Sequence, residues 1–160
     1  MELLSYLETT AFSEWVKISM LGFPTLIAVH SIGMGVAVGL SLMITLHLHR
    51  IFRGLKPDLI PRLLGVAVWG FGVNLVTGVA LFVSRGTEYI ASEVFVTKML
   101  LVLTSAMILF WLRHRLKVVE PATKPLAPDL ATRSMSLICS ACWFGAVATG
   151  RLIAYMSELY

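Results

Sequence analysis

Charged residues are scarce in this chain. Of its 160 residues, 14% are charged and 58% are hydrophobic, whereas a soluble domain carries about 25% charged residues. The chain therefore lacks the polar surface that a water-soluble protein needs, and we expect a membrane protein. Only two cysteines are present, Cys139 and Cys142, and both lie in an apolar stretch, so the sequence indicates no disulfide framework.

Several kinds of catalytic pattern are also missing from the sequence. It has no glycine-rich phosphate loop, no Ser-His-Asp set at matching depth and no carboxylate inside its long apolar stretches. These absences argue against hydrolysis, phosphoryl transfer and a proton relay of the pump type. The first residues include Glu2, Glu8 and Glu14, so we expect no signal peptide, because such a segment begins with positive charge.

Four long apolar stretches fill most of the chain. They cover about residues 20–46, 63–83, 94–112 and 134–155, and each is near the roughly 20 residues of a transmembrane helix. Lipid admits helices but no open sheet edges. The sequence therefore predicts an all-α integral membrane four-helix bundle over residues 18–160. Residues 1–17, with apolar residues at helical spacing and Trp15, predict a short interfacial amphipathic helix.

The distribution of lysine and arginine predicts the orientation. The loop between the second and third stretches has only Arg85, next to Glu88 and Glu93, whereas the other two loops are basic. Their cations are Arg50, Arg53, Lys56, Arg62, Arg113, Arg115, Lys117, Lys124 and Arg133. By the positive-inside rule these two loops are cytoplasmic, which predicts a multi-pass protein of the bacterial inner membrane with both termini periplasmic. The net charge of +4 is then a topology signal, and we expect no nucleic-acid partner.

One histidine and two cations are expected at similar depth on three different helices. His30 lies six to ten residues into the first stretch, or about 9–15 Å below the outer surface. Lys98 is near the start of the third stretch, Arg151 is near the end of the fourth, and Arg85 ends the second. A histidine beneath such cations suits a haem or another anionic ligand, because the imidazole could bind iron and the cations could neutralise propionates. Asn74, near the middle of the second stretch, either bonds to a neighbouring helix or contacts a ligand.

The same residues also have structural interpretations. His30 can bond to a neighbouring carbonyl or to the hydroxyl of Ser31, Thr77 or Thr149, because an unpaired polar group is costly in hydrocarbon. Lys98 and Arg151 can extend along their own stems to the interface.

A copper site is an alternative to haem. His30 and Met34 are four residues apart and share a helix face, and soft sulfur selects Cu(I). Cys139 and Cys142 form a C-x-x-C pair, which we interpret as buried packing residues. His47, His49 and His114 flank the cytoplasmic ends of two stretches, where we expect solvated interface residues.

Glycines crowd the first two stretches. The spacing Gly35-x3-Gly39, with Gly33 and Ala37 beside it, predicts a small-residue face where two helices approach closely.

Three segments carry a resemblance to a known family. AVHSIGMGVAVGLSL, WGFGVNLVTGVALF and FVTKMLLVLTSAMILFWL resemble the CopD superfamily of four-helix-core membrane proteins, which includes the HemJ type of protoporphyrinogen oxidase and short uncharacterised bacterial proteins. The matching positions are His30, Gly39, Thr77-Gly78 and Lys98, within about residues 25–112. In the HemJ branch the resemblance implies haem b on the histidine and a functional lysine, and in the CopD branch it implies copper handling. This chain departs from HemJ proteins in having no third-stretch histidine before His114.

The leading hypothesis is a haem b-binding inner-membrane protein of the electron-transfer or redox type. His30 is its expected axial ligand, with Lys98, Arg151, Arg85 and Asn74 around the cofactor. The alternatives are copper transport or tolerance through His30 and Met34, and a structural anchoring subunit of a membrane complex. The expected partners are the lipid bilayer, a redox partner or other membrane subunits, and further copies of the chain.

Overall fold

The computed structural model describes residues 2–118 and 128–159, and throughout these ranges the regular structure is helical. Lys124 of the basic loops lies outside the described residues. The elements are α1 (Glu2–Glu8), α2 (Ala11–Ile18), α3 (Gly22–Leu48), the 3₁₀ turn η1 (Pro57–Leu59), α4 (Ile60–Ser84), α5 (Gly86–Ile90), α6 (Glu93–Val118) and α7 (Leu130–Leu159).

The four long helices α3, α4, α6 and α7 confirm the predicted fold class. Each is long and apolar enough to cross a membrane, and the described exterior is apolar, with Trp69 and Val76 of α4 exposed at 78% and 70%. Such a surface is compatible with lipid and not with water. The chain is therefore an all-α, four-helix membrane bundle.

The helices extend beyond the apolar stretches that predicted them. α4 begins at Ile60 rather than at 63, and α6 continues through its basic residues to Val118. Lysine and arginine are good helix formers, so a helix does not end where its hydrophobicity ends.

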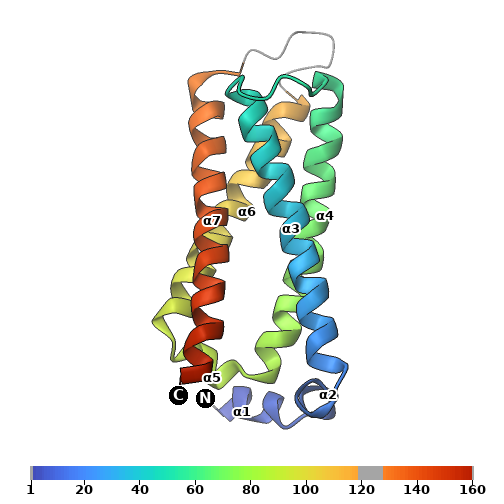
Figure 1. Cartoon of the computed structure of the whole chain (residues 1–160), viewed down its shortest axis with the longest axis vertical. Helices are drawn as coiled ribbons and strands as arrows, with labels where there is room; N and C mark the ends of the chain where they lie inside the picture. Colours follow the sequence, from blue (N-terminus) through green and yellow to red (C-terminus); the bar gives the residue numbers. More distant parts are fainter. Residues whose placement is uncertain (1, 119–127, 160) are drawn as a thin grey trace.

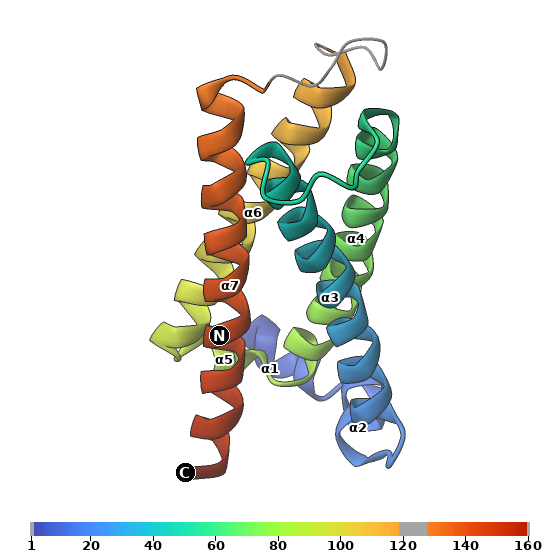
Figure 2. The same cartoon turned by 45° about the horizontal axis from the view of Figure 1, so that its top comes forward.

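The bundle consists of two antiparallel pairs, α3 with α4 and α6 with α7 (Figure 1). We call the end with α1, α2 and α5 the N-terminal end, and the end with the α3–α4 connection the basic end. The pairs meet through α3 with α7 and α4 with α6. They approach each other at the basic end and diverge toward the N-terminal end, as Figures 1 and 2 both show.

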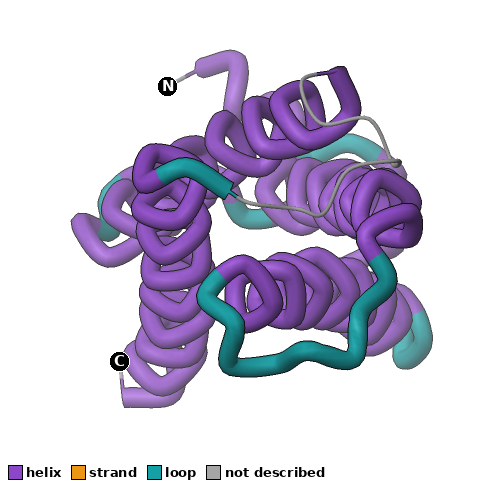
Figure 3. Tube along the Cα trace, turned by 90° about the horizontal axis from the view of Figure 1, so that it is seen from above, coloured by secondary structure: helices purple, strands orange, loops and turns teal. Residues whose placement is uncertain are grey.

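Apolar packing joins the two pairs from the middle of the bundle to the basic end. There Phe71 of α4 meets Trp143 of α7 edge to face, with ring centroids 5.9 Å apart. The buried apolar residues are Ala37, Ile44, Leu48, Ile60, Leu64, Ala67, Phe71, Val102, Ala106, Leu109, Leu112, Leu116, Cys139, Trp143 and Ala146. This half of the bundle is the hydrophobic core, and the view from above shows the four helices arranged around it (Figure 3).

Close packing of α3 on α4 depends on glycines other than the predicted pair. A Cβ atom at Gly33 would lie 2.8 Å from both Asn74 N and Gly70 O, whereas at Gly35 or Gly39 it would meet nothing within 4 Å. Of the small-residue face expected around Gly35 and Gly39, Gly33 makes the close contact, whereas the expectation for Gly35 and Gly39 themselves is wrong. The two helices approach most closely where the backbone of Gly33 on α3 meets that of Gly70 on α4.

Hydroxyl groups link α3 to α7 within the core. Thr45 Oγ1 lies 2.9 Å from Ser140 Oγ and 3.1 Å from Ser136 O. Cys139 is buried, and its thiol donates to Ser105 O of α6 over 3.5 Å. In the described ranges no group of three or more His, Cys, Asp or Glu side chains could hold a metal ion, so the Cys139-x-x-Cys142 pair lacks further ligands of these types.

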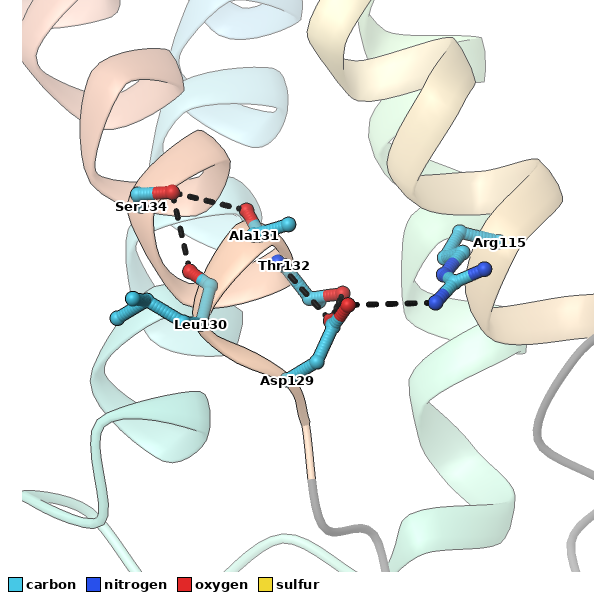
Figure 4. Close-up of polar contacts among 6 residues, drawn as sticks. All are labelled: Arg115, Asp129, Leu130, Ala131, Thr132 and Ser134. Carbon is cyan, nitrogen blue, oxygen red and sulfur yellow. Dashed lines mark hydrogen bonds and ion pairs between the residues drawn. The ribbon is translucent and has the colours of Figure 1, made fainter.

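Asp129 fixes the start of α7 at the basic end (Figure 4). Its Oδ1 accepts hydrogen bonds from the backbone N–H of Thr132, at 3.1 Å, and from the Thr132 hydroxyl, while Oδ2 forms an ion pair with Arg115 at 3.3 Å. The Thr132 hydrogen bonds and, to a smaller extent, the Arg115 charge lower the pKa of Asp129. The carboxylate thus caps α7 and ties it to α6.

Two short helices, not the single predicted one, lie across the N-terminal end. The chain breaks at Thr9-Thr10 because the Thr10 hydroxyl accepts from Ser13 N and caps α2. Glu8 accepts from Thr87 N at 2.7 Å and from Thr87 Oγ1 at 2.8 Å. These bonds lower the pKa of Glu8 and attach α1 to α5.

Candidate functional site

His30 lies on α3 toward the N-terminal end and faces α4. Its Nδ1 atom is 3.0 Å from the backbone oxygen of Asn74 and 3.2 Å from Thr77 Oγ1. A carbonyl oxygen can only accept, so Nδ1 carries the hydrogen and donates to Asn74 O. The Thr77 hydroxyl in turn donates to Val73 O, 2.7 Å away. This proton assignment leaves the Nε2 lone pair of His30 as an acceptor.

The Asn74 side chain completes this network. Its amide nitrogen is 2.9 Å from His30 O and 3.2 Å from His30 Nε2, so its two hydrogens can both be donated to His30. Asn74 itself is buried. The network therefore joins α3 to α4 by side-chain bonds and meets the requirement that polar groups in lipid find partners inside the protein.

Of the expected hydroxyl partners of His30, the structure brings Thr77 to the ring. Thr149 bonds instead to Gly145 O of its own helix, at 2.9 Å, and Ser31 is exposed.

Glycine lines the edge of the His30 ring. A Cβ atom built at Gly78 of α4 would lie 3.1 Å from His30 Cε1. That contact is tighter than ordinary van der Waals packing, so an alanine at this position would push against the imidazole. The ring is half-buried, and the absence of a side chain at Gly78 allows it to approach α4 closely.

Lys98 of α6 approaches the same region from the other helix pair. Its side chain is half-buried and packs toward α7, where a Cβ atom at Gly150 would be 3.6 Å from Nζ. In the part of the chain that the structure describes, Lys98 has no carboxylate partner and no side-chain hydrogen bond.

The other expected site residues are less closely associated. Arg85 lies between α4 and α5, and its charge faces Glu88 at 4.0 Å. Arg151 is exposed on α7, next to Gly150. Met34 is half-buried one helical turn after His30.

Two features of the site were not predicted. One feature of the sequence could have indicated the contact of Lys98 with Gly150, because a glycine directly precedes Arg151 at the depth expected for the site. No feature of the sequence indicated that the backbone oxygen of Asn74 would accept a hydrogen bond from His30. Every residue carries such an oxygen, and only the crossing of α3 on α4 selects this one.

In comparisons with known proteins, no family model, no curated protein and no solved structure matches this chain. Fold and site together define the class: an all-α membrane protein of four spanning helices, with a histidine–asparagine network between α3 and α4 and a half-buried lysine on α6 that packs toward α7.

Proposed function

We propose that this chain is a haem b-binding membrane protein of the electron-transfer or redox type, with His30 as an axial ligand. The observation that carries this proposal is the hydrogen bond from His30 Nδ1 to Asn74 O. Histidines that bind metals usually donate their second ring nitrogen to a carbonyl or carboxylate, which fixes the tautomer and the ring orientation. In this tautomer Nε2 is the nitrogen available for iron.

The surrounding residues fit a haem if one hydrogen bond of His30 is replaced by a bond to iron. Nε2 now accepts from Asn74 Nδ2 at 3.2 Å, and iron ligation would replace that contact, while the amide keeps its 2.9 Å bond to His30 O. Gly78 and Gly150 place no side chain beside His30 and Lys98. When bound, haem b would supply one-electron exchange at its iron.

The cation of Lys98 supports an acidic ligand. An ammonium group without a carboxylate partner is costly inside an apolar bundle, and a haem propionate would pair with it. We assign Arg151 and Arg85 as further propionate partners nearer the surface. Asn74 positions the ring of His30.

The proposed setting follows from the charged loops. We place the protein in a bacterial inner membrane with both termini periplasmic, since the basic end carries most of the loop cations. In that orientation the haem would lie nearer the periplasmic face and would exchange electrons with a redox partner or another membrane subunit.

A structural anchoring subunit is the second candidate. It is favoured by the complete pairing of both His30 ring nitrogens with α4 groups, which would lock α3 to α4 without any cofactor. Copper has less support, because the described residues hold no group of three His, Cys, Asp or Glu side chains, leaving His30 with the thioether of Met34.

The test is the absorption spectrum of the detergent-purified chain, oxidised and then reduced with dithionite, with haem and metal analysis of the same sample. We expect a Soret band and sharp reduced α and β bands in the wild type, lost in His30→Ala. His47→Ala is the matched control, since it removes a histidine from the other end of α3 and should keep the spectrum. A wild type without haem that copurifies with a partner would support the anchoring subunit instead, and stoichiometric copper would support the copper alternative.

A further inference from the structure

A pocket of about 350 Å³ opens at the basic end of the bundle. It is lined by His47 and Leu48 at the end of α3, by Arg50 and Arg53 of the following loop, and by Pro128 just before α7. The pocket thus combines three basic side chains with an apolar wall, far along α3 from His30.

Arg50 occupies a backbone position that normally favours glycine. Its φ is 61°, in the left-handed region. Around it the end of α3 has the bonds of a Schellman motif, with Ile51 N on Leu46 O at 3.0 Å and Arg50 N on His47 O at 2.9 Å. Glycine is the usual residue at this position of the motif. Because glycine would suit this turn better, an arginine here that also lines a pocket indicates that the guanidinium group has a role at this position.

Backbone carbonyls orient the neighbouring basic groups. His47 Nδ1 donates to Phe52 O at 3.0 Å, which leaves its Nε2 free of that bond. Arg53 Nε donates to Arg50 O at 3.4 Å, so its two terminal nitrogens remain for a ligand.

No carboxylate among the side chains that the structure describes forms an ion pair with Arg50 or Arg53. The nearest acid in sequence to Pro128 is Asp129, and its carboxylate is occupied by Thr132 and Arg115. Among the side chains that the structure describes, none compensates the two guanidinium groups of the pocket by an ion pair.

We propose that this pocket binds the phosphate group of an anionic phospholipid. Guanidinium groups are opposite in charge to a phosphate and fit its hydrogen-bond geometry, and basic pockets at the ends of spanning helices are suited to lipid headgroups. Ile51 and Phe52, beside Arg50, are 74% and 44% exposed. These apolar side chains can contact acyl chains, which free phosphate lacks.

The experiment measures lipid adducts on the detergent-purified full chain by native mass spectrometry. Phosphatidylglycerol and phosphatidylcholine with identical acyl chains are titrated separately, and inorganic phosphate is then added to the phosphatidylglycerol complex. We expect tighter binding of phosphatidylglycerol, no displacement by inorganic phosphate, and about fivefold weaker binding for each arginine removed.

Arg50→Gly removes the guanidinium while suiting the left-handed turn, so the variant should fold. Arg53→Gln is the second variant, in a segment without the positive φ. Arg62→Gln is the matched control, because it removes an exposed cation from the same end without lining the pocket, and its affinity should equal that of the wild type.

If Arg62→Gln and Arg50→Gly weakened phosphatidylglycerol binding equally, the proposed pocket would be refuted, because binding would then depend on the overall positive charge of this end. No preference for phosphatidylglycerol, or its displacement by inorganic phosphate, would overturn the lipid assignment.

Discussion

Replacing Gly33 with alanine should separate α3 from α4 and disturb the His30 network. The new Cβ atom would lie 2.8 Å from Asn74 N and from Gly70 O. Both are backbone atoms that cannot rotate away, so one helix must move. Asn74 is also the residue whose carbonyl holds His30, 3.0 Å from Nδ1, and a displaced α4 backbone would lengthen that bond.

The expected loss is about 2 kcal/mol of unfolding free energy. Overpacking of a filled contact costs about 1–3 kcal/mol, and weakening one interhelical hydrogen bond in a membrane protein adds about 0.6 kcal/mol. Against this, alanine is about 1 kcal/mol better than glycine inside a helix. Gly35→Ala should gain this helix stabilisation without a clash, because nothing lies within 4 Å of its Cβ position.

Unfolding by dodecyl sulfate in mixed detergent micelles, followed by circular dichroism, measures the difference. Gly33→Ala should be less stable than the wild type, and Gly35→Ala equal to it or more stable. If the two variants had the same stability, the glycine contact between α3 and α4 would be refuted.

Two further predictions concern the two ends of the bundle. Thr45→Val removes the hydroxyl contact with Ser140, 2.9 Å away. It should lower the unfolding free energy by about 1 kcal/mol in the same detergent titration. Thr104→Val is the control and should change the unfolding free energy little, because the Thr104 hydroxyl bonds only within its own helix. Because hydrogen bonds from Thr87 lower the pKa of Glu8 below its ordinary 4.5, the carboxylate stabilises the α1–α5 contact above that value and loses this effect as pH falls through its folded pKa. The protection factors for amide hydrogen exchange in residues 2–18, which correct for the intrinsic pH dependence of exchange, should therefore fall with acidification in the wild type, while Glu8→Gln should show lower protection at neutral pH and respond less to acid.

The fold could be predicted because lipid leaves few choices. A stretch of about 20 apolar residues in a membrane must satisfy its own backbone, and a helix does so. The ends of α4 and α6 could not be placed, since basic residues at the interface continue a helix as well as apolar ones do. The break at Thr10 depended on one capping hydroxyl.

Helix faces were harder to predict than helix positions. Counting residues predicted similar depths for His30 and Lys98; in the structure His30 bonds to α4, whereas Lys98 packs toward Gly150 of α7. The predicted small-residue face centred on Gly35 and Gly39, with Gly33 and Ala37 beside them, and only Gly33 among these glycines makes the close contact, because a lipid-facing glycine and a packed one look the same in sequence. Only the crossing at Gly33 selects Asn74 O as the partner of His30.

The placement of Lys98 remains the strongest reason to expect an anionic ligand between the helix pairs. A lysine this near the end of a spanning helix can extend its ammonium to water along its own stem, and it then needs no partner. Here the side chain is half-buried and packs toward Gly150 of α7. An anchoring role explains the bonds between α3 and α4, but it gives no reason to hold a cation beside them. A ligand with both a metal for His30 and a carboxylate for Lys98 accounts for both features, and haem b has that composition.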